Sequence, residues 1–193
     1  MLKQRFFKGG AAVPHRKNTA ECRTVKMGVP SVVVIPMSQH IGAPCQAVVK
    51  KGDEVKVGQV IGSSDKFVSS PVHSSVSGIV KDVSPRLYAG GIFIESVEIE
   101  TDGKQEVHES VKPPAVSNRK EFLDAIRNSG LVGLGGAGFP THVKLTLPEG
   151  VKVDTLVVNA AECEPYITSD YRELVENTEG FMAGLCKVLD MLE

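Results

Sequence analysis

The chain has 193 residues, of which 41% are hydrophobic and 23% charged, and its formal net charge is −1. This length suits one or two domains with apolar cores, and the balance of hydrophobic and charged residues excludes a disordered tail. A membrane-spanning chain is excluded as well, because the longest apolar stretch, around Val32 to Ile35, is far shorter than the roughly 20 residues that a bilayer needs. The first ten residues show no signal peptide, so we expect a soluble, cytosolic polypeptide.

Charge is unevenly spread along the chain. Residues 1–30 carry a local charge of +6, from seven Lys or Arg and one Glu, and residues 149–193 carry −7, from three Lys or Arg and ten Asp or Glu. The basic segment is short and lacks an interleaved aromatic platform, which disfavours nucleic-acid binding. We expect a solvated basic N-terminal arm, with contact to an acidic partner or a membrane surface as the alternative.

Metal-ligating residue types occur without the spacing of a metal site. None of the four cysteines stands in a Cys-x-x-Cys pair, so this sequence predicts neither zinc nor iron–sulfur ligands, and free thiols are expected. His40 and His73 lack a third ligand and are interpreted as structural.

Short β-branched runs separated by turn signals fill the first half of the chain. They are Val32–Ile35, Ala47–Val49, Gly78–Val80 and Gly91–Ile94, and the last of them leads into the alternating Val97–Glu100. Alternation of apolar and charged residues is typical of a half-buried strand. Several short strands with Gly and Pro turns predict a small all-β barrel or sandwich.

Two of these segments, residues 51–61 and 70–80, resemble the two halves of a biotinyl/lipoyl domain, whose fold is a barrel-sandwich hybrid. Lys66 follows an aspartate between the halves, as the modified lysine of a lipoyl domain does. It comes eight residues after Gly58, however, which is too far for a carrier lysine. We therefore predict that Lys66 carries no lipoyl or biotinyl group.

Beyond a predicted linker over residues 112–118, the pattern becomes helical. Asn118 and Glu121 have the spacing of a capping box, and Gly130 suits the position after a helix end. A helix is therefore expected between Asn118 and Gly130. A later amphipathic stretch predicts a second helix, with an apolar face formed by Phe181, Leu185, Leu189 and Leu192.

A glycine-rich segment lies between these helices. It has five glycines in the nine positions from Gly130 to Gly138, which excludes a helix or strand interior. Backbone without β-carbons can approach a ligand closely, its N–H groups can cradle a phosphate, and Lys144 adds a positive charge nearby. A tight structural turn is the alternative, and the order differs from a Rossmann motif because no strand precedes the glycines.

An acidic turn follows the β-branched run Thr155–Val158, which predicts a buried strand. Ligands of α/β folds collect beyond the carboxyl ends of strands, which is where Asn159, Glu162 and Glu164 stand. An asparagine can bond the edge of an isoalloxazine ring, and carboxylates can accept hydrogen bonds from ribose hydroxyls. A solvated acidic loop is the alternative.

Longer strings point to one family. "FKGG" at 7–10, "HRKNT" at 15–19, "IPMSQHIGAP" at 35–44 and "PVHSSVSG" at 71–78 resemble the N-terminal region of the RnfC subunit of the Rnf complex. "GLGGAGFPTHVK" at 133–144 and "NAAECEP" at 159–165 resemble the flavin- and NADH-binding subunit of respiratory complex I and its Rnf relatives. Leu134 and Ala161 depart from the complex I pattern, which favours the Rnf branch.

This resemblance implies an α+β multi-domain fold, in which a barrel-sandwich hybrid precedes the first part of an α/β FMN- and NADH-binding domain. The expected divisions are a basic arm at 1–30, the β domain at 31–111, the linker at 112–118 and the flavin part at 119–193. The implied contacts to FMN are Gly133, Gly135, Gly136, Lys144, Asn159 and Glu162, with Glu164 near the nicotinamide nucleotide. No catalytic side chain or metal ligand is implied within the chain.

The function implied is that of an ion-translocating ferredoxin:NAD⁺ oxidoreductase. Such a complex transfers electrons between ferredoxin and NAD(H) through FMN and [4Fe–4S] clusters, coupled to translocation of Na⁺ or H⁺. Its partners would be the other Rnf subunits, on the cytoplasmic side of the bacterial inner membrane. The chain is expected to be an N-terminal fragment, inactive alone, with a β domain that folds by itself and a loosely held segment after residue 112. The alternatives are a soluble relative that serves an amino-acid reductase, and a non-enzymatic docking module.

Overall fold

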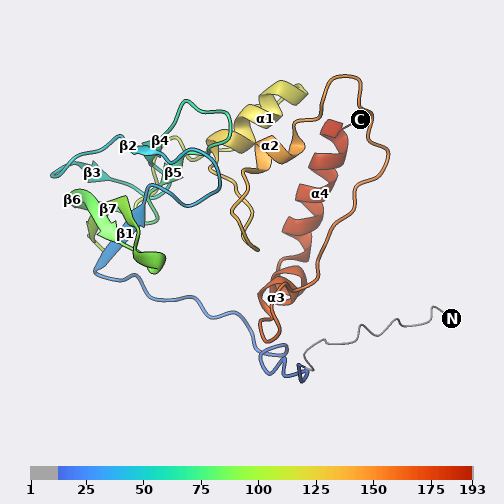
Figure 1. Cartoon of the computed structure of the whole chain (residues 1–193), viewed down its shortest axis with the longest axis horizontal. Helices are drawn as coiled ribbons and strands as arrows, with labels where there is room; N and C mark the ends of the chain where they lie inside the picture. Colours follow the sequence, from blue (N-terminus) through green and yellow to red (C-terminus); the bar gives the residue numbers. More distant parts are fainter. Residues whose placement is uncertain (1–12, 193) are drawn as a thin grey trace. The chain divides into compact units, whose positions relative to one another are not determined.

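The computed structural model describes residues 13–192, and the chain divides into two compact units (Figure 1). One unit, called the β unit, contains residues 27–153 and the last residues of the chain. The other, called the helical unit, contains residues 154–190 together with the described part of the chain before residue 27. Each unit is described by itself. The predicted domain boundaries stay predictions.

Within residues 13–192, seven strands form two antiparallel sheets, both in the β unit. The first sheet has the order β1-β7-β6-β3 and the second has the order β2-β4-β5. The strands are β1 (Val32–Pro36), β2 (Gln46–Ala47), β3 (Glu54–Val55), β4 (Val60–Ser63), β5 (Val72–His73), β6 (Gly78–Leu87) and β7 (Phe93–Thr101). The strands predicted at 32–35, 78–80 and 97–100 are thereby confirmed.

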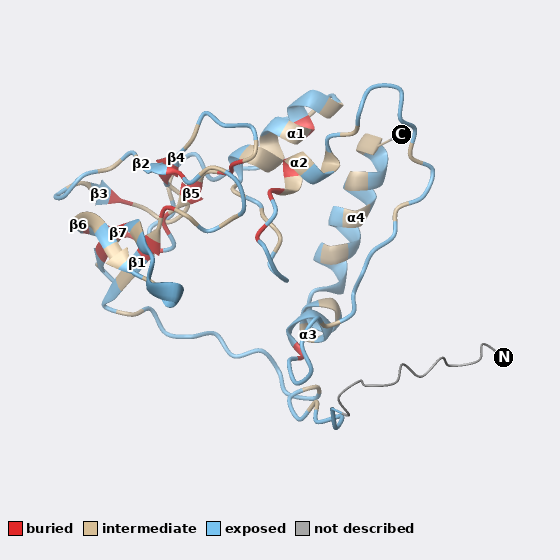
Figure 2. Ribbon diagram, in the orientation of Figure 1, coloured by how far each residue is buried: buried red, intermediate tan, exposed pale blue. Residues whose placement is uncertain are grey.

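Strand β7 shows how the alternating sequence builds the core. Val97 and Ile99 are fully buried, whereas Glu98 between them faces outward and accepts a hydrogen bond from Arg86 at 2.6 Å. Figure 2 shows buried residues on and around the strands, and further ones on α1 and α2. The apolar core of the described residues consists of Ile35, Met37, Cys45, Val55, Ile61, Val72, Val76, Val80, Val97 and Ile99.

Helix α1 (Arg119–Asn128) begins and ends where the sequence predicts. The side chain of Asn118 accepts a hydrogen bond from the Glu121 amide at 2.9 Å, and the Glu121 carboxylate accepts from the amide and hydroxyl of Ser117. Gly130, at φ +74°, lies just beyond the helix end in the left-handed conformation that a C-terminal glycine supplies.

Helix α1 is attached to the β sheets. The Arg127 guanidinium donates hydrogen bonds to the carbonyl oxygens of Ser64 and Lys66 at 3.1 and 3.0 Å, and the Ser70 hydroxyl donates to the carbonyl of Arg127. Phe122 on the same helix is buried. The expectation of a loosely held segment after residue 112 stays a prediction, but α1 is anchored by Arg127, which bonds the backbone of the loop that carries Lys66. The absence of an adduct on Lys66 stays a prediction.

The helical unit contains α3 (Ser169–Glu176) and most of α4 (Thr178–Leu192). The predicted second helix is confirmed, although no residue of α4 is buried. The predicted buried strand at 155–158 is wrong: this stretch has no regular secondary structure, and Val157 is 82% exposed. A strand needs a hydrogen-bonded neighbour, and no described strand pairs with this run. No helix in the described range 13–192 is both long and apolar enough to cross a bilayer.

Candidate flavin and nucleotide site

The glycine-rich segment of the β unit is a closed loop. Its base is tied by two hydrogen bonds, from the Gly133 amide to the Phe139 carbonyl at 2.9 Å and from the Thr141 amide to the Leu131 carbonyl at 3.1 Å. Helix α2 (Thr141–Leu145) starts directly behind the loop. It carries the exposed Lys144, whose ammonium forms no ion pair with the described residues.

Four of the five glycines in this segment fall into two classes, and Gly133, with Phe139 in ordinary contact at 3.6 Å from its Cβ position, lies between them. Gly130 and Gly138 have positive φ angles of 74° and 63°, and a Cβ on Gly138 would lie only 2.8 Å from the carbonyl oxygen of Gln39. Gly135 and Gly136 have no positive φ, and no described protein atom lies within 4 Å of where their Cβ would be. The fold demands glycine at the first pair but not at the second, where the open space leaves the backbone free to approach a ligand.

The β unit holds this loop through the "SQHIG" segment. The Ile41 amide donates to the Ala137 carbonyl at 3.1 Å, beside the contact of Gly138 with Gln39. The His40 ring fixes this turn, because its Nε2 lies 3.0 Å from the Ser70 carbonyl oxygen and 3.1 Å from the Ser70 amide, and its Nδ1 lies 3.2 Å from the Ile41 carbonyl oxygen. His40 thus has a structural contact on each ring nitrogen.

Two further histidines join the glycine segment to the β sheets. His142 on α2 is buried, and its Nε2 lies 2.9 Å from the Phe67 carbonyl. His73 on β5 packs against Gly130, where a Cβ would come within 2.7 Å of its Nδ1. Burial lowers the pKa of His73 below the ordinary histidine value.

The acidic turn belongs to the helical unit, and its side chains are partly committed to local structure. The side-chain oxygen of Asn159 accepts a hydrogen bond from the Ala161 amide at 3.0 Å. One carboxylate oxygen of Glu162, Oε1, accepts a hydrogen bond from the Tyr171 amide at 3.1 Å. The other oxygen, Oε2 of Glu162, is buried and has no hydrogen-bond partner among the described residues. The Glu164 side chain is exposed.

A segment that the sequence analysis did not assign to the site, residues 17–24, is hydrogen-bonded to this turn and to α3. We call it the N-terminal strap. Lys17 donates to the carbonyl oxygens of Ile167 at 2.6 Å and Glu164 at 3.3 Å. Farther along, Arg172 on α3 donates to the Ala20 carbonyl at 2.9 Å.

The strap is not a free arm, because it is hydrogen-bonded to the acidic part of the same chain, although most of its residues are exposed as expected of a solvated arm. The opposite local charges of residues 1–30 and 149–193 were the signal that could have found this contact. The part of the predicted arm before residue 13 lies outside the described residues.

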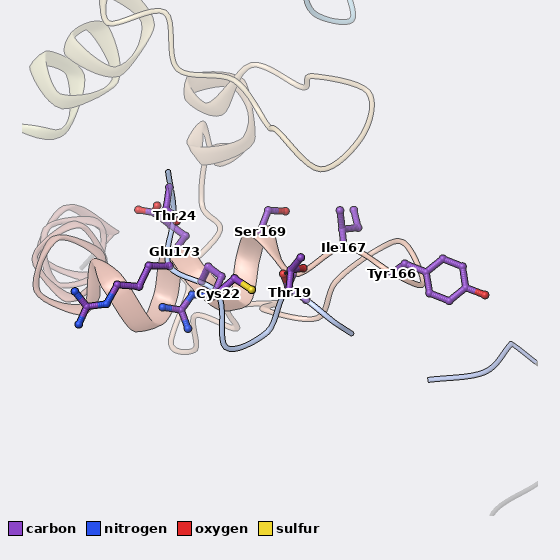
Figure 3. Close-up of a pocket in the computed structure, with 10 residues that line it drawn as sticks. Thr19, Cys22, Thr24, Tyr166, Ile167, Ser169 and Glu173 are labelled. Carbon is purple, nitrogen blue, oxygen red and sulfur yellow. The ribbon is translucent and has the colours of Figure 1, made fainter. Parts of the chain in front are cut away.

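An open groove of about 520 Å³ lies between the strap and α3 (Figure 3). Thr19, Cys22 and Ser169 line it, and Tyr166 stands at one end. None of the predicted site residues lines this groove. Of those residues, Gly133, Gly135, Gly136 and Lys144 belong to the β unit, and Asn159, Glu162 and Glu164 belong to the helical unit.

The strap is expected to loosen in acid. The Arg172 guanidinium donates a hydrogen bond to the Glu176 carboxylate and so holds the pKa of Glu176 below the ordinary glutamate range. The Thr24 amide, which donates to the same carboxylate, contributes to this shift. A carboxylate with a lowered pKa stabilises the fold above its ordinary pKa, and this stability is lost as the pH falls through the lowered value. The Thr24 amide resonance should therefore shift in a nuclear magnetic resonance titration with a midpoint below the ordinary glutamate pKa of about 4.3. A midpoint above that value would contradict the observed pairing.

Free thiols are confirmed at all four cysteines: Cys45 is buried, and Cys22, Cys163 and Cys186 are exposed. Within residues 13–192 there is no group of three or more His, Cys, Asp or Glu side chains that could hold a metal ion.

Comparison with known proteins gives two family matches. Residues 5–104 match the family model described as the RnfC barrel sandwich hybrid domain, and residues 126–193 match the one described as the Nuo51 FMN-binding domain. The barrel-sandwich hybrid followed by part of a flavin domain, predicted from the sequence, is thereby confirmed as the fold class.

Three curated relatives illustrate the similarity. The C subunit of the Na⁺-translocating ferredoxin:NAD⁺ oxidoreductase complex of Acetobacterium woodii is 48% identical over 95% of this chain and 42% of its own length. The C subunit of the proton-translocating complex of Clostridium ljungdahlii is 43% identical over 100% of this chain and 42% of its own. The C subunit of the ion-translocating oxidoreductase complex of Rhodobacter capsulatus is 34% identical over 89% of this chain and 34% of its own length. The chain thus spans less than half the length of these relatives.

Proposed function

Because the chain belongs to the RnfC family, we propose that it contributes FMN- and NADH-binding residues to the RnfC subunit of an ion-translocating ferredoxin:NAD⁺ oxidoreductase. The observation that carries this proposal is the open space beside Gly135 and Gly136. Nothing in the fold of the described residues requires glycine at these two positions, whereas a ligand lying against the backbone does.

The whole protein would transfer electrons between ferredoxin and NAD(H), coupled to movement of Na⁺ or H⁺. The names of the Acetobacterium and Clostridium relatives support this activity. Its partners would be the other subunits of the complex, with the protein on the cytoplasmic side of the cell membrane. The [4Fe–4S] clusters implied by the resemblance would be held by residues outside this sequence.

The glycine loop would hold the phosphate end of FMN. Backbone N–H groups at Gly135 and Gly136 would donate to phosphate oxygens, and Lys144 would supply a positive charge close by. Gly133 would contribute its open backbone, because its own N–H already donates to the Phe139 carbonyl. Bound FMN would supply the redox chemistry that links the two-electron carrier NADH to one-electron carriers. The part of the protein is to bind and orient the two molecules.

The acidic turn would hold the other polar groups. The buried, unpartnered Oε2 of Glu162 fits a ligand hydroxyl, because a hydrogen bond from that hydroxyl would satisfy an acceptor that otherwise costs free energy to bury. Asn159 would bond the edge of the isoalloxazine ring. The exposed Glu164 would accept from the nicotinamide nucleotide.

Charge removal at Lys144 and Glu164 tests the assignment in the full-length protein. Lys144→Ala should weaken FMN binding about tenfold, since a charge-assisted contact is worth roughly 1.5–3 kcal/mol and this lysine is exposed. Glu164→Gln should leave FMN binding unchanged and impair NADH oxidation. Flavin fluorescence and steady-state kinetics measure both effects.

Lys152→Ala is the matched control for Lys144, because Lys152 is exposed in the same unit. Normal FMN binding in Lys144→Ala together with normal NADH oxidation in Glu164→Gln would contradict these roles. A full-length wild-type protein that retains no flavin would contradict the proposed function and favour a docking module.

A further inference from the structure

The end of helix α3 that lies next to the acidic turn is capped in an unusual way. Thr168 occupies the N-cap position, from which a threonine side chain normally accepts the amide of the third helical residue. Its side chain makes no such bond. That amide, from Tyr171, is instead taken by Oε1 of Glu162, which comes from the acidic turn.

The Thr168 side chain is hydrogen-bonded to the strap instead of to the helix. The hydroxyl groups of Thr19 and Thr168 lie 2.7 Å apart and share a hydrogen bond, and Thr168 is 7% exposed. Thr168 thus bonds the strap, while the Tyr171 amide donates to Glu162. Capping commits Oε1 of Glu162 and leaves its Oε2 buried without a partner among the described residues.

Lys17 acts on the same turn from its other end. Its ammonium holds two carbonyl oxygens three residues apart, those of Glu164 and Ile167, and so closes the backbone between them. Bonds from a charged donor are roughly twice as strong as neutral ones, and no described carboxylate pairs with this lysine.

From these contacts we propose that Lys17 and Thr19 are positioning residues of the nucleotide site. They hold the turn from Glu162 to Ile167 in the conformation that presents Oε2 of Glu162 and the side chain of Glu164 to a ligand. The inference rests on the proposed function for its ligand. Neither residue needs to touch that ligand.

The test uses the full-length protein and three variants. Lys17→Met removes the ammonium and keeps the apolar stem, Lys17→Arg restores a cationic donor, and Thr19→Val removes the hydroxyl at nearly constant shape. We expect Lys17→Met and Thr19→Val each to raise the KM for NADH about tenfold, because small displacements of a binding group are costly, while kcat changes less than twofold. Lys17→Arg should restore most of the affinity.

A second measurement needs no bound ligand. Hydrogen exchange in the flavin-free protein should become faster at the Tyr171 amide and in residues 164–168 of Lys17→Met and Thr19→Val, while exchange in the β-sheet core stays unchanged. Lys26→Met is the matched control, because Lys26 is exposed just beyond the strap and makes no hydrogen bond or ion pair within the described residues. It should leave both measurements unchanged.

An unchanged KM and unchanged exchange in Lys17→Met would overturn the inference, as would an equal effect of Lys26→Met. These outcomes differ from failure of the proposed function itself, in which the wild-type protein neither retains FMN nor oxidises NADH.

Discussion

Gly138→Ala is expected to destabilise the β unit and to abolish FMN binding by displacing the glycine loop. A side chain at φ +63° is strained, and the added Cβ would lie 2.8 Å from the Gln39 carbonyl oxygen and 3.0 Å from the His40 Cα. Strain of about 1–2 kcal/mol and overpacking of about 1–3 kcal/mol together predict a loss of about 2–5 kcal/mol in the free energy of unfolding. Both neighbours are backbone atoms, so relief requires movement of the loop or of the "SQHIG" turn.

Chemical denaturation of the variant measures this loss, and a flavin-fluorescence titration measures the effect on FMN. Gly103→Ala is the matched control, because Gly103 also has a positive φ, +72°, but no atom within 4 Å of its Cβ position. It should show the strain alone, about 1–2 kcal/mol. Equal destabilisation in the two variants would mean that the contact between the loop and the "SQHIG" turn contributes nothing.

Gly135→Val, unlike Gly138→Ala, is expected to weaken FMN binding without destabilising the protein. No described atom lies within 4 Å of the Cβ position and φ is not positive, so the free energy of unfolding should change by no more than about 0.5 kcal/mol. A branched side chain would fill the space through which a flavin phosphate must approach the backbone. FMN affinity should therefore fall at least about a hundredfold, which is about 2.7 kcal/mol.

Gly28→Val provides the comparison for this variant. Gly28 also lies in the β unit with open space around its Cβ position and no positive φ, but outside the glycine loop. It should change neither stability nor flavin binding. If Gly135→Val bound FMN as the wild type does in the full-length protein, the loop would be a structural turn and no longer a flavin cradle.

Local patterns predicted the elements whose formation depends on neighbours in sequence. Alternation placed Val97 and Ile99 in the core, and the spacing of Asn118 and Glu121 placed the start of α1. Thr155–Val158 has the same kind of local signal, yet it forms no strand. A helix satisfies its own backbone, whereas a strand depends on a partner that a local pattern does not contain.

The sequence predicted which residue types form the candidate site, but not which other parts of the chain hold those residues in place. Glycines, a lysine and carboxylates can be recognised by the chemistry they offer a ligand. The distinction between Gly138, which the fold requires, and Gly135, which it does not, depends on what stands beside each Cβ position. Gln39, the neighbour of Gly138, lies 99 residues earlier in the sequence.

By itself, the sequence determined the family, the order of a β part followed by a helical part, and the residues that offer ligand chemistry. Sequence motifs, hydrophobic periodicity and helix-capping residues all depend on residues that are close in sequence. Only the tertiary structure decided that "SQHIG" supports the glycine loop and that Lys17 and Thr19 fasten the turn of Glu162. Hydrogen bonds between residues 30 to 150 positions apart depend on how the backbone folds back on itself. Local composition does not encode that path, and even the opposite charges of the two chain ends indicate attraction without specifying which atoms meet.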